Sequence, residues 1–277
     1  MKILIQSNNK QKLASKIAAA SFIKQGFSHN DIKFLEFENN SFLKSKINKK
    51  YLRKGIIKTF KDDLQSFTLL RFYGPEFINY KGKILIIDPD VFAIKDPKDI
   101  SNFLNQDSYL ACTFINRKPR SEVMMIDATK VKWKFKEIIE KLFNLEIDYD
   151  DLMNLSFDKY LKINELDLKY NSHDQITAET ILLHTSNRIT QPWKEGLDVD
   201  FERHHSKRNI IKQKLRKFLG LKYNKDMIED KYYKHPNEEV IERFKELYNF
   251  ALEHKIINNN EVEDAIKNKF FTKNFLL

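Results

Sequence analysis

Two aspartates that flank a single proline stand directly after an apolar run, and their spacing suits metal chemistry. Asp88 and Asp90 enclose Pro89 and follow the run KILII at residues 83–87. In an extended chain, residues i and i+2 point to the same side, so both carboxylates can face one point. Two hard oxygen ligands suit Mg²⁺ or Mn²⁺, and a divalent cation relieves the repulsion between them. The alternative is an ordinary polar turn, because Asp-Pro and Pro-Asp are common turn dipeptides.

A distant histidine is the second candidate ligand. His184 ends the apolar run ILLH and precedes the polar segment TSNRITQPW. A neutral imidazole is an acceptable third ligand for Mn²⁺, although a lone histidine can equally be a satisfied core or loop residue. Trp193 at the end of this segment either walls a pocket or simply packs in the core.

The elements that must position these residues alternate between strand and helix. Strands are expected at Lys2–Ser7 and Ile32–Phe37, with a helix over Gln11–Lys24 between them. Such a β-α-β crossover implies a parallel sheet. The continuous apolar run at Lys83–Ile87 indicates a strand covered on both faces. Ligand sites of open α/β sheets lie at the carboxyl ends of the strands, where Asp88 follows.

Later elements continue the pattern and then change character. Strands are expected at Ser108–Phe114, Glu122–Ile126 and Thr180–Leu183, and helices at Leu64–Phe77, Ala128–Phe143 and near 236–254 and 260–271. The prediction is an α/β fold with a mostly parallel central sheet over residues 1–201. Residues 202–277 are predicted to form a helical C-terminal extension.

The composition fits a globular chain with anionic partners. The chain has 277 residues, 42% of them hydrophobic, and a net charge of +10. That balance favours nucleic acid, acidic lipid or phosphorylated small molecules. Cys112 is the only cysteine, which excludes a disulfide framework and a multi-cysteine metal site, and we expect it to be buried. The sequence shows neither a secretory apolar segment nor a membrane span, so we expect a cytoplasmic location.

Two segments concentrate the positive charge. Residues 203–222 and 44–61 each contain eight Lys/Arg and no Asp or Glu. The first predicts a basic amphipathic helix, which either lies on an anionic membrane surface or packs on the domain with a solvated basic face. The second is either a mobile loop near the site or soluble surface. Aromatic residues are not interleaved with these runs, so no nucleic-acid partner is expected.

Four stretches in sequence order resemble nucleotide-sugar glycosyltransferases of family 8, which have the GT-A fold. They are FTLLRFYGPEFINYKGKILIIDPDVFAIKDP at 67–97, RSEVMMIDATKVKW at 120–133, LKYNSHD at 168–174 and HTSNRITQPW at 184–193. The stretch TQPWKEGLDVDF and the tail YKHPNEEVIERF are similar to a bacterial subgroup of glycosyltransferases. The likeness extends over nearly the whole chain.

The resemblance implies a role for each matching position. Asp88 and Asp90 match the family's DxD pair, and His184 matches its third metal ligand. The positions expected to hold the nucleotide-sugar donor are Gln6, Ser7, Asn8, Arg71 and Ser121. Asp150 and Asp151 fall near the acidic element that reaches the transferred sugar, with Asn171 and Asp174 as rival candidates.

Some positions depart from the family pattern. Gln191 stands where the family has a phosphate-binding lysine, and Arg188 could supply the charge through a bidentate guanidinium. Arg120 and Glu122 replace the asparagine and glycine on either side of Ser121. The metal triad is intact.

The implied activity is metal-dependent, retaining transfer of a sugar from a nucleoside diphosphate, UDP above all, to an acceptor hydroxyl. The cation, Mn²⁺ or Mg²⁺, stabilises charge on the departing diphosphate. Either a covalent intermediate or front-face attack could give retention. A glycan or glycolipid acceptor at the inner face of a membrane would suit the basic segments. Rival interpretations are a non-catalytic sugar-nucleotide-binding relative and a metal-dependent nucleotidyltransferase.

Overall fold

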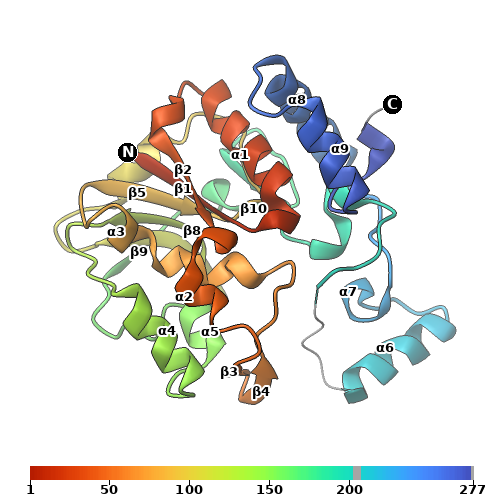
Figure 1. Cartoon of the computed structure of the whole chain (residues 1–277), viewed down its shortest axis with the longest axis horizontal. Helices are drawn as coiled ribbons and strands as arrows, with labels where there is room; N and C mark the ends of the chain where they lie inside the picture. Colours follow the sequence, from red (N-terminus) through yellow and green to blue (C-terminus); the bar gives the residue numbers. More distant parts are fainter. Residues whose placement is uncertain (202–206, 276–277) are drawn as a thin grey trace.

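A central six-stranded sheet organises the protein, which we describe from a computed structural model covering residues 1–201 and 207–275 (Figure 1). The strand order is β2-β1-β5-β8-β7-β9. The strands are β1 (Lys2–Ser7), β2 (Ile32–Glu36), β5 (Lys83–Ile87), β7 (Leu110–Ile115), β8 (Lys118–Asp127) and β9 (Ile163–Glu165). Only β8 pairs antiparallel with its two neighbours, so the sheet is mostly parallel, which confirms the predicted α/β class.

Both faces of this sheet are covered, as the unbroken apolar run of β5 predicts. Ile3 and Leu85 pack into one apolar cluster together with α1 (Lys12–Lys24). Leu4 and Ile84 point the other way, into a second cluster with α4 (Phe135–Phe143). Alternation along the strands therefore feeds two separate cores. Cys112 lies in the second cluster and is fully buried, as expected.

Two predicted helices are shorter than the sequence pattern suggests. The segment Leu64–Phe77 forms a 3-10 helix (Ser66–Phe72) followed by the short α3 (Gly74–Phe77). A Cβ on Gly74 would lie 2.4 Å from a methyl group of Ile86, so close contact with β5 dictates the path of the chain there. The helix expected from Ala128 begins only at Phe135. Trp133, just before it, is packed between the rings of Phe72 and Phe157, and this packing overrides helix propensity.

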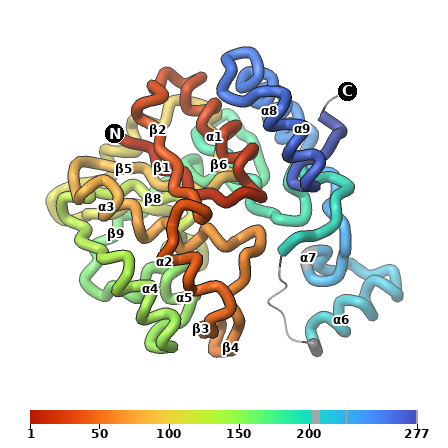
Figure 2. Tube along the Cα trace, viewed as in Figure 1, coloured from red at the N-terminus to blue at the C-terminus, as the bar shows by residue number. Residues whose placement is uncertain are grey.

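Two smaller sheets complete the α/β part. One has the order β10-β11-β6 and consists of β10 (Ser172–His173), β11 (Leu182–His184) and β6 (Val91–Ala93). The other is a hairpin of β3 (Lys50–Arg53) and β4 (Ile56–Thr59) within the basic stretch 44–61. The short helices α2 (Ser41–Lys44) and α5 (Tyr149–Met153) belong to the same side of the molecule as the hairpin (Figure 2).

The C-terminal part is helical. Its helices are α6 (Lys207–Phe218), α7 (Lys225–Ile228), α8 (Glu238–Glu253) and α9 (Asn259–Lys267). α8 and α9 lie beside α1 and share its apolar cluster, whereas α6 projects at the lower right (Figure 1). The predicted basic helix is confirmed over 207–218, and residues 202–206 lie outside the described part. The division of the chain at residue 201 remains a prediction.

In the described ranges, no helix combines the length and the apolar character needed to cross a bilayer.

Candidate active site and metal centre

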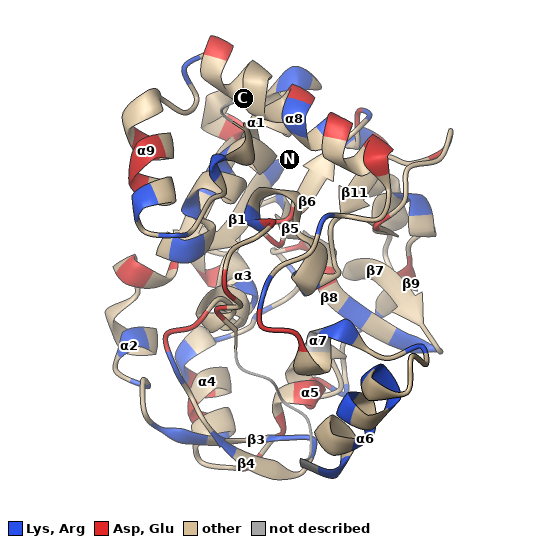
Figure 3. Ribbon diagram, turned by 90° about the vertical axis from the view of Figure 1, so that its right-hand side faces the viewer, with Lys and Arg blue, Asp and Glu red and all other residues tan. Residues whose placement is uncertain are grey.

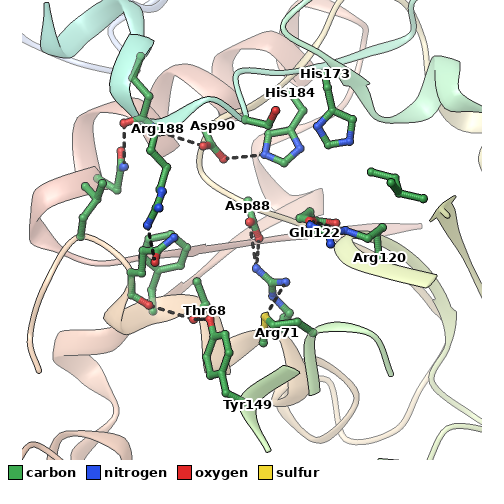
Figure 4. A pocket seen from close by; sticks show the side chains of 18 of the residues that line it. Thr68, Arg71, Asp88, Asp90, Arg120, Glu122, Tyr149, His173, His184 and Arg188 are labelled. Carbon is green, nitrogen blue, oxygen red and sulfur yellow. Dashed lines mark hydrogen bonds and ion pairs between the residues drawn. The ribbon is translucent and has the colours of Figure 1, made fainter. Parts of the chain in front are cut away.

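The small sheet brings the two aspartates and the distant histidine together. Asp88 and Asp90 connect the end of β5 to β6, and β6 pairs antiparallel with β11 so that Val91 lies opposite His184. Ligand atoms of Asp88, Asp90 and His184 all lie within 4.8 Å of one another, and His184 Nε2 is 3.5 Å from Asp90 Oδ1 (Figure 4). The three side chains are almost completely buried.

A buried arginine side chain holds Asp88 in place. Arg71, in the 3-10 helix Ser66–Phe72, directs Nη2 to both Asp88 oxygens at 2.7 and 2.9 Å. Its Nη1 donates to Ser121 Oγ at 2.7 Å, and the Gln6 amide also donates to Asp88. Gln6 and Ser121 therefore stand around the aspartate and its arginine, and neither lines the cavity described below.

Asp90 and His184 are oriented by amides. Gln191 Nε2 donates to Asp90 Oδ2 at 3.0 Å, so Gln191 contacts one of the candidate metal ligands. Asn171 lies behind His184, with its side-chain oxygen 2.8 Å from Nδ1, and its amide nitrogen donates to Thr113 at 3.0 Å. Asn171 is fully buried outside the cavity.

The electrostatics of this cluster suit a cation. Burial raises the pKa of Asp88 above its ordinary value although the Arg71 guanidinium opposes the shift, and Asp90 adds to the rise. Burial alone would lower the pKa of His184, but the neighbouring carboxylates, Asp90 first, raise it. A proton on His184 thus compensates negative charge that a divalent cation could compensate instead.

The donor set fits Mn²⁺ or Mg²⁺. Cation bonds of about 2.1 Å keep neighbouring ligand atoms roughly 3 Å apart, close to the His184–Asp90 separation. Two carboxylates and one imidazole match the preference of Mn²⁺, and the hydrogen bond that Nδ1 of His184 donates to the Asn171 side-chain oxygen is the usual support of a ligating histidine.

The cluster opens into a cavity of about 420 Å³ (Figure 4). Four arginines line it, namely Arg53, Arg71, Arg120 and Arg188. Three carboxylates also line it: Asp88, Asp90 and Glu122. The remaining polar lining includes Gln65, Thr68, Tyr149 and His173. A mixed wall of guanidiniums and a few carboxylates can bind a phosphorylated, hydroxyl-rich ligand.

Among the cavity-lining residues predicted to bind the nucleotide-sugar donor, Arg188 is the most exposed. Its Nη1 donates to Gln65 at 3.2 Å, and its guanidinium stacks on the ring of Phe201 at 4.2 Å. Trp193, by contrast, packs against Phe92 and Phe244 in the core and does not line the cavity.

Several predicted residues make structural contacts outside the cavity. Ser7 ends β1 and Asn8 follows it, where Asn8 caps a turn by accepting from Gln11 N at 3.1 Å. Asp151 belongs to a capping box with Asp148 at the start of α5, and Asp150 is its neighbour on the same short helix. None of the four lines the cavity.

Asp174 likewise works as a tie between segments. Its Oδ2 accepts from Ser186 Oγ at 2.8 Å and from Asn187 N at 3.1 Å, and its Oδ1 is 3.2 Å from His235 Nε2. These bonds fix the chain just after His184 to the C-terminal part, and Asp174 does not line the cavity.

Sequence reasoning missed the functional positions of four cavity residues. Arg53 comes from β3, Tyr149 from α5 and His173 from β10, whereas Glu122 had been noted only as a departure from the family pattern. The signal for Arg53 is the basic stretch 44–61, which the sequence predicts to be a mobile loop near the donor site or soluble surface, without singling out a residue. Tyr149 stands beside the aspartates that were chosen instead.

Comparisons with known proteins give structural matches only. No protein-family model and no curated protein sequence matches the chain. The galactosyltransferase LgtC, solved with donor and acceptor sugar analogues, matches with a TM-score of 0.48 and 13% identity over 71% of this chain and 90% of its own. The glycosyltransferase GlyE of Streptococcus pneumoniae matches at 0.45 and 17%, over 72% of this chain and 58% of its own.

A third match is mouse xyloside xylosyltransferase 1, with a TM-score of 0.42 and 8% identity over 67% of this chain and 97% of its own. Each of the three is a glycosyltransferase by name. Scores and identities this low do not assign an activity, which we infer from the site itself.

Proposed function

We propose that the chain is a metal-dependent glycosyltransferase that moves a sugar from a nucleoside diphosphate, UDP first among them, to an acceptor hydroxyl. The observation that carries the proposal is the buried Asp88–Asp90–His184 cluster in the wall of a cavity lined by four arginines. A divalent cation held there supplies charge stabilisation for a departing diphosphate. The family 8 resemblance supports a retaining outcome.

Three of the four arginines divide into two groups in this proposal, and the fourth, Arg120, pairs with Glu122. Arg71 is committed to Asp88 and Ser121, so it positions the metal ligand. Arg188 and Arg53 reach the cavity from different segments, and we assign them to the diphosphate. Arg188 thereby takes the place of the lysine that the family pattern has at Gln191, whose amide is occupied with Asp90.

We assign Glu122 to the transferred sugar. It is the cavity-lining carboxylate of the described chain that lies outside the metal triad. Its Oε1 accepts from Arg120 at 3.0 Å, but no donor reaches the buried Oε2. Burial alone would raise the pKa of Glu122, yet Arg120 lowers it, so the carboxylate is charged at neutral pH. A charged carboxylate with one oxygen that receives no hydrogen bond suits a sugar hydroxyl. In the proposal Glu122 takes the role for which Asp150, Asp151 and Asp174 were candidates.

Two other functions would use the same cavity. A non-catalytic relative would bind UDP-sugar with a cation but release no UDP, and the amide of Gln191 at Asp90 is the observation in its favour. A nucleotidyltransferase would release pyrophosphate from a nucleoside triphosphate. Identification of the released product separates both from a glycosyltransferase.

We further propose that the acceptor is a glycan or glycolipid, such as a lipopolysaccharide or another surface glycan. The expected place of work is the cytoplasm, at the inner face of a membrane. The basic segments support this acceptor class through charge, because lipid-linked glycans at that face lie on an anionic surface.

Thermal stability with a panel of nucleoside diphosphates and nucleotide sugars tests the donor half. A ligand that binds only the native state raises Tm by mass action, so UDP with Mn²⁺ should raise Tm more than either alone. The variant Asp90→Ala should lose the Mn²⁺-dependent part and all turnover, while Asp99→Ala, at an exposed aspartate of the 3-10 helix Lys98–Phe103, should behave as the parent. If no nucleotide changes Tm, with or without cation, the donor site is wrong.

A further inference from the structure

Two basic elements far apart in sequence present apolar side chains at the same end of the molecule. The β3–β4 hairpin and helix α6 both lie at the lower end in Figure 1 and again in Figure 3, where Lys and Arg mark them in blue. Neither element carries an Asp or Glu. The hairpin belongs to the α/β part and α6 to the C-terminal part, so the shared surface exists only in the folded chain.

The hairpin exposes two neighbouring isoleucines at the start of its second strand. Ile56 and Ile57 are 53% and 54% exposed although they begin β4. The preceding turn, Lys54-Gly55, has positive φ at both residues, and both of its amides donate to the carboxylate of Asp148. The turn is therefore anchored, and the exposed isoleucines stand on a fixed support flanked by lysines.

Helix α6 exposes an apolar stripe of its own. Ile211, Leu215 and Phe218 are spaced i, i+4 and i+7, which places them on one helical face, and Leu219 directly after the helix continues the stripe, with its amide donating to the Leu215 carbonyl at 3.0 Å. Their exposed fractions run from 57% for Leu215 to 86% for Phe218. The exposed side chains of Lys212, Lys214 and Lys217 accompany them, and Lys217 pairs with Glu229 to hold the helix to the body.

We propose that these residues form one docking face for an anionic phospholipid bilayer. The docking face consists of Ile56 and Ile57 with the lysines of the hairpin, together with Ile211, Leu215, Phe218 and Leu219 with the lysines of α6. Large apolar side chains at 53–86% exposure gain by entering the boundary between headgroups and acyl chains. Clustered lysines on two elements that themselves contain no Asp or Glu are attracted to the negative surface of acidic lipids.

The docking face is continuous with the cavity through one strand. β3 ends at Arg53, which lines the cavity, and β4 carries the exposed isoleucines. Docking by this face would place the rim of the cavity next to the bilayer, where a lipid-linked acceptor would be within reach. Membrane binding itself needs neither donor nor acceptor, so its test is independent of the proposed transferase activity.

Co-sedimentation of the full chain with vesicles tests the proposal. Vesicles of phosphatidylcholine with phosphatidylglycerol should pellet the chain at low salt, and vesicles of phosphatidylcholine alone should not. High salt should weaken the binding. Replacement of Phe218 and Leu215 by Ser, or of Ile56 and Ile57 by Ser, should each lower the partition coefficient by roughly tenfold. Leu168→Ser, which changes a 60% exposed leucine outside both elements, is the matched control and should bind as the parent.

A second pair of variants addresses charge without removing apolar area. Lys212→Glu with Lys214→Glu should lower binding at low salt and have little effect at high salt. All of these positions are exposed, so Tm should stay unchanged and a loss of binding reports on the surface itself. Equal pelleting with neutral vesicles, or parent-like binding by both serine pairs, overturns the proposal.

Discussion

The Nδ1 atom of His184 lies 2.8 Å from the side-chain oxygen of Asn171, and this contact decides which ring nitrogen faces Asp90. An amide oxygen only accepts, so Nδ1 carries the hydrogen and donates it. Asn171 is in turn oriented by its own donation to Thr113 at 3.0 Å. Nε2 is left as the atom that takes either a proton or a cation, 3.5 Å from Asp90 Oδ1.

Removal of this support should weaken metal binding without touching a ligand. Asn171→Ala should lower Mn²⁺ affinity about 10–100-fold, the range expected when the partner of a ligating histidine is lost. Asn171→Asp keeps an oxygen acceptor and should retain more of the affinity than Ala does. Free Mn²⁺ measured by electron spin resonance gives the affinity directly, with no need for turnover.

Asn164→Ala is the matched control, because its amide donates to a backbone oxygen beside β9, away from the metal cluster. Parent-like Mn²⁺ affinity in Asn171→Ala would mean that the ring is held by its other surroundings, and that the hydrogen bond is structural only.

Glu122 should affect transfer far more than donor binding. Glu122→Gln keeps the shape but replaces the charged acceptor, so we expect sugar transfer to fall about 100-fold or more. The affinity for UDP with Mn²⁺ should change by no more than about threefold, since the triad and the arginines stay in place. Product release measured by chromatography, beside calorimetric titration of UDP, separates the two effects.

The carboxylates predicted from the family pattern allow a direct comparison with Glu122. Asp150→Asn should transfer normally, because Asp150 lies outside the cavity, and Glu165→Gln on β9 is a neutral exposed control. If Asp150→Asn abolishes transfer while Glu122→Gln does not, the interpretation drawn from the family pattern is right and the assignment of Glu122 fails.

The sequence predicted those parts of the fold that periodic apolar patterns encode. β1 and β5 match their predicted ranges because every residue after the first is buried, whichever face it points to. The β3–β4 hairpin was missed because its lysine-rich strands carry little apolar pattern. Tyr51 anchors it by packing against Phe60 and Phe143, contacts that a local pattern does not show.

In the site, too, local sequence patterns predict some residues, and long-range contacts place the others. Asp88, Asp90 and His184 could be chosen by residue type and by their place at strand ends. Glu122 could not, because its position depends on the pairing of β5 with β8, where Ile87 lies opposite Val123 and Asp88 N donates to the Glu122 carbonyl at 3.1 Å. The register between β5 and β8, two strands far apart in the sequence, places the Glu122 carboxylate beside the triad. No local spacing in the sequence predicts this register.

A buried ion pair just after Trp193 should contribute to stability in a pH-dependent way. Lys194 is fully buried, and its Nζ lies 2.6 Å from Asp200 Oδ2. Lys194→Met leaves Asp200 without its cation and should cost about 3 kcal/mol of unfolding free energy, while Lys234→Met at an exposed pair should leave the unfolding free energy nearly unchanged. Denaturant titration of both variants measures the difference.

The sign of the pH effect follows from the pKa of Lys194. Burial lowers this pKa below its ordinary value, although Asp200 opposes the shift. The unfolded chain therefore binds the proton more tightly, and the parent should gain stability relative to Lys194→Met as the pH rises from the lowered pKa toward that of a free lysine. A stability difference that shrinks over that range would contradict the inferred burial effect.

Arg188 should decide how tightly the diphosphate is held. Its guanidinium lines the cavity and is pre-oriented by Phe201 and Gln65, so we expect Arg188→Met to weaken UDP binding by roughly tenfold or more at fixed Mn²⁺. Arg188→Lys keeps the charge but loses the planar fork and should fall between Met and the parent. UMP, which lacks the second phosphate, should be affected less than UDP. Arg243→Met, at a half-buried arginine paired with Glu246 on α8, is the matched control. Equal losses for UMP and UDP would show that Arg188 supports the cavity wall and does not contact the diphosphate.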